Sequence, residues 1–69
     1  MQKTFIPYNE FTDRVLEVIS TVPNVTIGKI TTILGAGALR IERAIEVLIR
    51  KGKVVEERFG RRFFYRRIN

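Results

Sequence analysis

Apolar residues recur with a helical spacing as far as Gly52 and alternate with polar ones afterwards. A spacing of three to four residues places apolar side chains on one stripe of a helix, whereas alternation is typical of a strand. The first stripe predicts a helix that begins after Asn9, a favourable N-cap, and ends before Pro23. It contains Phe11, Val15, Val18, Ile19 and Val22.

Two further helices are predicted, and a short turn of small residues joins them. The first spans 26–34, opens with the capping residue Thr26 and ends at Gly35, which suits the left-handed position after a helix. The second spans 38–51 and stops at Gly52. Its buried stripe is expected to contain Ile41, Ala44, Ile45 and Leu48. Two helices joined by a tight turn form a helix-turn-helix.

Two strands rich in β-branched and aromatic residues follow, at 53–59 and 62–68. Gly60-Arg61 between them suits a two-residue type II′ turn, and a slightly longer loop is the alternative. The chain is therefore predicted to be one α+β domain over 1–69. It is divided into an N-terminal arm (1–8), a three-helix core (9–52) and a C-terminal β-hairpin (53–69).

The buried face of the second strand is ambiguous, because aromatic residues occupy both of its alternating sets. Phe63 and Tyr65 compete with Phe64 and Ile68 for the core. We expect Phe64 and Ile68 to pack inward.

Length and composition describe a small folded domain. A chain of 69 residues lies near the lower limit of what folds unaided, and its 45% hydrophobic content is that of a globular protein. No apolar run approaches the roughly 18 residues of a membrane span, and the start lacks the pattern of a secretory signal. We therefore expect a cytoplasmic protein with no membrane partner.

The positive charge is concentrated at the C-terminal end. The net charge is +6, and the last 12 residues hold five Arg, interleaved with three Phe and one Tyr, and no Asp or Glu. A focused cationic segment on an otherwise nearly neutral domain favours a polyanionic partner, with nucleic acid as the first candidate.

The order of elements resembles the winged helix-turn-helix DNA-binding family over residues 9–68. The segments that carry the resemblance are 26–35, 40–51, 51–54 and 61–65. The family pattern is degenerate in sequence and indicates no subfamily, although compact members are common as regulators in bacteria, archaea and their mobile elements. Members usually lay the third helix in the major groove of double-stranded DNA, while the hairpin, or wing, contacts the backbone.

The resemblance assigns base reading to one face of the third helix. Arg40, Arg43 and Val47 are the candidates, since a guanidinium can bridge guanine O6 and N7 and Val47 can touch a thymine methyl. A partly buried boundary position is the alternative for Val47. The alternative for the arginines is a solvated face, on which Glu46 pairs with Arg50.

Phosphate contacts are expected from the second helix, the end of the third helix and the hairpin. The hairpin arginines have an alternative role in keeping an aromatic strand soluble, and its aromatic residues are expected to pack rather than to stack on bases. The phosphate candidates are Lys29, Thr31, Thr32, Arg50, Arg58, Arg61, Arg62 and Arg66.

Catalysis, metals and cofactors find no support in the sequence. The chain has no His and no Cys, and Gly35-Ala-Gly37 lacks the Lys-Ser/Thr sequel of a phosphate-binding loop. The expected function is a small transcriptional regulator that binds double-stranded DNA. The alternative is a nonspecific nucleoid-like binder or a protein-interaction module of a replication or transcription assembly. A homodimer would form through the arm residues Phe5, Ile6 and Tyr8.

Overall fold

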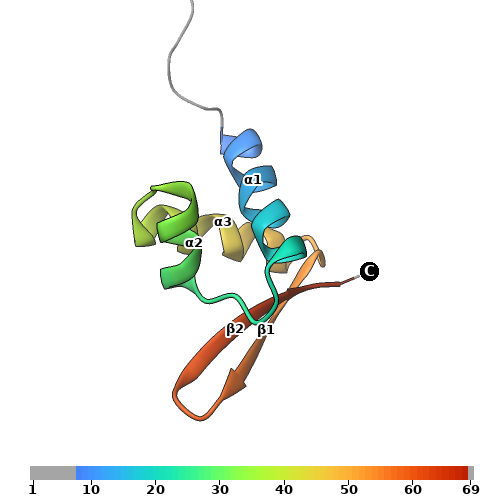
Figure 1. The fold of residues 1–69 in the computed structure, drawn as a ribbon. Helices are drawn as coiled ribbons and strands as arrows, with labels where there is room; N and C mark the ends of the chain where they lie inside the picture. Colours follow the sequence, from blue (N-terminus) through green and yellow to red (C-terminus); the bar gives the residue numbers. More distant parts are fainter. Residues whose placement is uncertain (1–7, 69) are drawn as a thin grey trace, which may run out of the picture.

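Three helices are followed by a two-stranded antiparallel hairpin, which confirms the predicted α+β fold class. The computed structural model describes residues 8–68. The helices pack against one another, and the turn of the hairpin lies farthest from them (Figure 1). The elements are α1 (Tyr8–Thr21), α2 (Ile27–Leu34), α3 (Ala38–Arg50), β1 (Val54–Phe59) and β2 (Arg62–Arg67).

The core forms where the apolar stripes of the helices meet the base of the hairpin. The predicted stripe of α3 is fully buried. The predicted stripe of the first helix is buried except for Val22, which is half-buried and lies one residue beyond the end of α1. Burial of these side chains supplies most of the driving force for folding. The buried hydrophobic residues are Phe11, Val15, Val18, Ile19, Val25, Ile30, Ile41, Ala44, Ile45, Leu48, Val54 and Tyr65.

The predicted ends of α2 are confirmed. Thr26 Oγ1 accepts a hydrogen bond from the Lys29 backbone N–H at 3.2 Å, and Gly35 ends the helix in the left-handed conformation with φ of 66°. α3 ends at Arg50, with Lys51 as its C-cap, one residue earlier than predicted.

The predicted start of α1 was wrong. The helix begins at Tyr8, which the sequence assigned to the arm, so Asn9 lies in the first turn instead of capping it. A capping side chain contributes only about 1 kcal/mol, which is too little to fix a helix start against other contacts. The rest of the arm, including Phe5 and Ile6, lies outside the described residues.

The hairpin has the predicted two-residue turn. Phe59 pairs with Arg62, which leaves Gly60 and Arg61 as the loop. Gly60 has φ of 63° whereas Arg61 does not have a positive φ, and this combination is that of a type II′ turn. Both strands are one residue shorter than predicted at their outer ends, although the Ile68 N–H still donates to the Lys53 carbonyl at 2.9 Å.

The predicted buried face of β2 was wrong. Tyr65 is 5% exposed, whereas Phe64 is half-buried and Ile68 is 43% exposed. The cause lies between α1 and α2, where a turn with Asn24 at φ of 52° brings the buried Val25 alongside β2. The Tyr65 N–H donates to the Val25 carbonyl at 3.0 Å in an isolated antiparallel bridge. This bridge fixes which alternating set of β2 faces the core.

Candidate functional site

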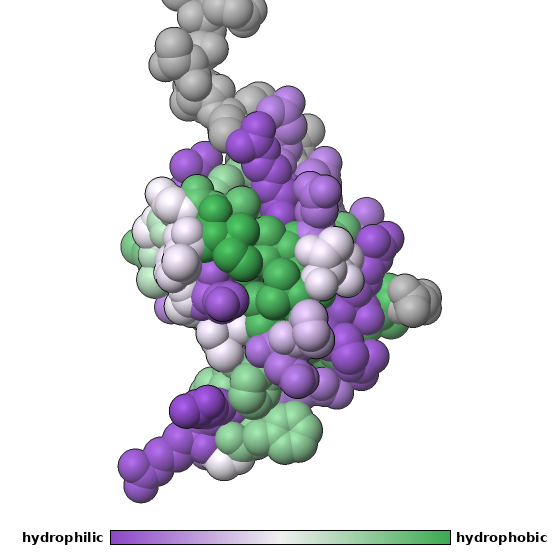
Figure 2. Space-filling model, in the orientation of Figure 1, coloured by the Kyte–Doolittle hydropathy of each residue, from purple (hydrophilic) through white to green (hydrophobic). Residues whose placement is uncertain are grey.

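The hairpin tip (58–62) carries exposed cationic and aromatic side chains. Phe59 is 66% exposed, and its ring contacts that of Phe64 with centroids 5.9 Å apart. At the end of the hairpin a hydrophilic side chain extends away from the body, beside more hydrophobic ones (Figure 2). The tip therefore combines positive charge with an apolar surface that the core does not cover.

Two arginines at the hairpin tip are available to a ligand. Arg61 and Arg62 are exposed, and the side chain of neither forms a hydrogen bond or ion pair within the described part of the chain. Arg58 is more constrained, because its Nε donates to the Gly60 carbonyl at 2.9 Å and its guanidinium lies 5.7 Å from the centre of the Phe63 ring. Free guanidinium groups are the side chains best suited to bind phosphate oxygens.

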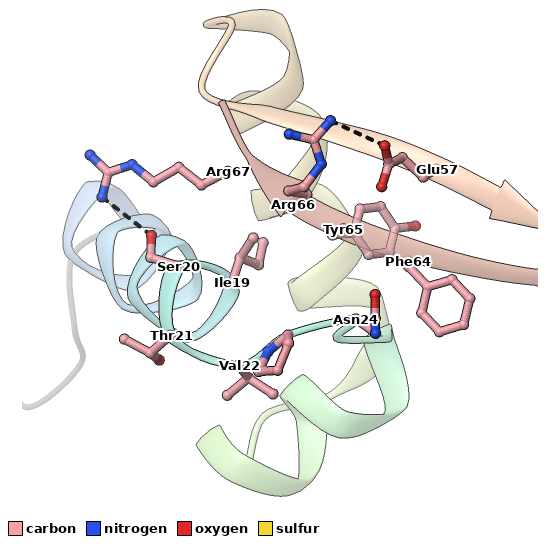
Figure 3. A pocket seen from close by; sticks show the side chains of 11 residues that line it. Ile19, Ser20, Thr21, Val22, Asn24, Glu57, Phe64, Tyr65, Arg66 and Arg67 are labelled. Carbon is pink, nitrogen blue, oxygen red and sulfur yellow. Dashed lines mark hydrogen bonds and ion pairs between the residues drawn. The ribbon is translucent and has the colours of Figure 1, made fainter. Parts of the chain in front are cut away.

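Two arginines nearer the end of β2 already have partners. Arg66 Nη2 donates to Glu57 Oε2 at 3.1 Å, and this bond raises the pKa of Arg66 above its ordinary value. Arg67 Nη1 donates to Ser20 Oγ at 3.2 Å. Both line a pocket of about 480 Å³ between the end of α1 and β2, as Figure 3 shows. The phosphate candidate Arg66 is thus partly neutralised by Glu57.

The base-reading candidates on α3 lie in different surroundings. The Arg40 guanidinium lies 4.0 Å from the centre of the buried Phe11 ring, a cation–π contact that holds it against α1. Arg43 is exposed, and its side chain has no hydrogen bond or ion pair within the described residues. Val47 is half-buried, as the boundary alternative expected. Arg43 is therefore the candidate whose guanidinium is free to reach a base.

The phosphate candidates on α3 and α2 also differ in whether their side chains already have a partner within the chain. Arg50 lies 3.9 Å from Glu46, which confirms the expected i, i+4 pair. Lys29 is exposed. The hydroxyls of Thr31 and Thr32 donate to the Gly28 carbonyl at 2.6 and 3.1 Å. A hydroxyl has one proton to donate and phosphate oxygens only accept, so neither threonine can donate to a phosphate in this conformation.

An acidic groove lies between α3 and the hairpin, and the sequence reasoning missed it. Glu42, Glu46 and Glu56 line it together with apolar residues, and no Lys or Arg is among the described residues that line it. Its volume is about 320 Å³. The spacing of Glu42, Glu46 and Ile49 at i, i+4 and i+7 was the available signal. The apolar lining consists of Ile27, Ile45, Ile49, Phe63 and Tyr65.

Tyr65 connects this groove to the core. Its hydroxyl donates to Glu56 Oε2 at 2.8 Å, so this buried phenol has a partner. Burial raises the pKa of Tyr65, and the hydrogen bond to Glu56 and the negative charges of Glu56 and Glu42 raise it further. The hydroxyl therefore stays protonated, and able to donate to Glu56, to a higher pH than an exposed phenol would.

Among residues 8–68, no group of His, Cys, Asp or Glu is arranged to hold a metal ion. None of the helices in that range is long and apolar enough to cross a membrane. Comparison of the chain with protein-family models, curated proteins and solved structures gave no match. The order of three helices and an antiparallel hairpin is compatible with a winged-helix shape.

Proposed function

We propose that the protein is a winged helix-turn-helix regulator that binds double-stranded DNA. The observation that carries this proposal is the hairpin tip, where the side chains of Arg61 and Arg62 are exposed without a partner in the described part of the chain. In the proposed complex these arginines bind backbone phosphates, which supplies affinity for any sequence.

Sequence reading is assigned to α3 and above all to Arg43. An α-helix fits the major groove, and an exposed guanidinium can bridge guanine O6 and N7. Arg40 contacts the Phe11 ring, so its first role is to fasten α3 to α1. The proposed mechanism of regulation is steric, because a domain bound to its site on DNA blocks access by other proteins.

The second candidate function, a protein-interaction module, is favoured by the acidic groove. Three carboxylates beside an apolar floor repel a polyanion and suit a cationic, partly apolar partner. This groove lies against the same α3 that the first proposal places on DNA. Reversing the charges of the groove should therefore tighten DNA binding if the first proposal holds, and should abolish a protein contact if the second holds.

A competition binding assay tests the proposed regulator. Selection from genomic fragments supplies the best site, and unlabelled random duplex competes against it. We expect the selected site to bind roughly 10³-fold more tightly than random duplex, as for specific regulators. A ratio of affinities near one would indicate a nonspecific DNA-binding protein. The absence of duplex binding at low salt would exclude both the specific regulator and the nonspecific binder.

A further inference from the structure

The acidic groove suits an occupant that combines positive charge with apolar surface. Its three carboxylates come from two elements, Glu42 and Glu46 from α3 and Glu56 from β1. Its floor includes hydrophobic side chains that the core leaves uncovered, since Ile49 is 39% and Phe63 is 43% exposed. Exposed apolar surface rimmed by charge is typical of an interaction site.

The hairpin tip has the complementary composition. It presents Arg61, Arg62 and the exposed ring of Phe59, whereas Arg58 lies on the other face of the hairpin, beside the Phe63 ring of its own chain. The groove presents three glutamates and an apolar floor. The two surfaces thus carry opposite charges, although Arg50 already lies 3.9 Å from Glu46, and each offers hydrophobic area to the other.

The tip cannot enter the groove of its own chain. The ladder pairs Phe59 with Arg62, Arg58 with Phe63 and Glu56 with Tyr65 without interruption. The same strands that carry the tip thus form one wall of the groove, and folding the tip back would break the ladder that makes this wall. The contact therefore has to be made by a second chain.

We propose that the acidic groove receives the hairpin tip of a second copy of this protein. In a two-fold dimer each tip lies in the partner's groove, so one symmetry operation makes the contact twice. Arg61 and Arg62 then face Glu42, Glu46 and Glu56, and Phe59 covers the apolar floor. The dimer uses the arginines that the proposed function assigns to phosphates. Self-association and DNA binding therefore exclude each other, a consequence that rests on that function, whereas the contact itself does not.

The test is sedimentation of the full chain without DNA, from micromolar to millimolar concentration at low salt. Wild type is expected to dimerise with rising concentration. The charge reversals E42K/E46K and R61E/R62E are each expected to raise the dimer dissociation constant by at least about tenfold, because like charges then face each other. Circular dichroism verifies that both variants are folded.

Mixing the two variants makes the test specific. The reversed groove of one then faces the reversed tip of the other, so a heterodimer forms although neither variant pairs with itself. Each variant keeps a net positive charge, so a general attraction between the chains does not explain the result. The matched control D13K/E17K changes the net charge of the chain as E42K/E46K does, but on exposed positions of α1 outside the groove. It should dimerise with itself, and it should pair with R61E/R62E more weakly than E42K/E46K does, because only one of the two contacts is then favourable.

A monomeric wild type at all concentrations overturns the proposal. So does a dimer that E42K/E46K leaves intact, since another surface then holds it. Because no DNA is present, neither result bears on the proposed DNA binding, which the competition assay tests separately.

Discussion

The two ends of the hairpin carry similar residues in opposite situations. At the base, Tyr65 is buried and bonded to Val25 and Glu56. At the tip, Phe59 is exposed and Arg61 has no partner within the described residues. The same division separates Arg40, which stacks on Phe11, from the free Arg43. A side chain's partners, rather than its type, therefore distinguish a structural residue from a candidate ligand-binding residue.

The largest effect is expected when the base is truncated. Tyr65→Ala should lower the free energy of unfolding by about 3–5 kcal/mol, because it leaves a cavity in the core and removes the phenol that bonds to Glu56. Phe59→Ala should change it by less than about 0.5 kcal/mol, because the ring is exposed. Urea unfolding followed by circular dichroism measures both values. Equal losses would mean that the tip is as much a part of the core as the base.

The two α3 arginines provide the next comparison. Arg43→Ala should weaken binding to the selected DNA site by about 1–3 kcal/mol and relax preference at one base pair, without loss of stability. Arg40→Ala should instead lower stability by about 0.5–1 kcal/mol through the lost contact with Phe11. Binding to a panel of single-base variants of the site, together with thermal unfolding, separates the two. Unchanged base preference in Arg43→Ala would contradict the assignment.

The tip arginines should affect DNA affinity without affecting its specificity. Arg61→Ala with Arg62→Ala should reduce the log-log salt slope of binding by about two and weaken all duplexes alike. The matched control replaces Arg66 and Arg67, whose guanidinium groups are held by Glu57 and Ser20, and should change the slope less. Binding measured over a series of salt concentrations gives both slopes. If both double variants reduced the salt slope equally, an arginine bonded to another residue of the chain would contact DNA as well as a free one does, which would contradict the prediction.

The helical part of the fold was predictable because its determinants are local. The spacing of Ile41, Ala44, Ile45 and Leu48 identifies the buried stripe of α3, and Thr26 and Gly35 mark the ends of α2. The hairpin turn was predictable for the same reason, because Gly60 accepts the left-handed conformation that a type II′ turn requires.

The orientation of β2 was not predictable, because a residue far away in sequence decides it. Both alternating sets of β2 contain aromatic residues, and only the bridge from Val25 to Tyr65 selects one of them. The candidate site was predictable only in part, for the same reason. Its charges can be counted in the sequence, whereas the partners of Arg40, Arg66 and Arg67 depend on tertiary contacts. The acidic groove likewise appears only when α3 lies beside the hairpin.

The smallest effect concerns the protonation of Tyr65. Its raised pKa in the folded chain means that its contribution to stability is complete below the unfolded value of about 10 and is lost as the pH rises further. The urea midpoint should therefore fall above about pH 10 more steeply in wild type than in Tyr65→Phe.

Absorbance titration reports the same group directly. The chain has two tyrosines, so Tyr8→Phe leaves Tyr65 as the only source of tyrosinate absorbance. Tyr65 should titrate above its ordinary value in this variant. Adding Glu56→Gln should lower that pKa only in part, because burial is the larger cause and persists. An ordinary pKa of Tyr65 in the folded protein would mean that the base of the hairpin is open to solvent. The contrast between a buried base and an exposed tip would then be wrong.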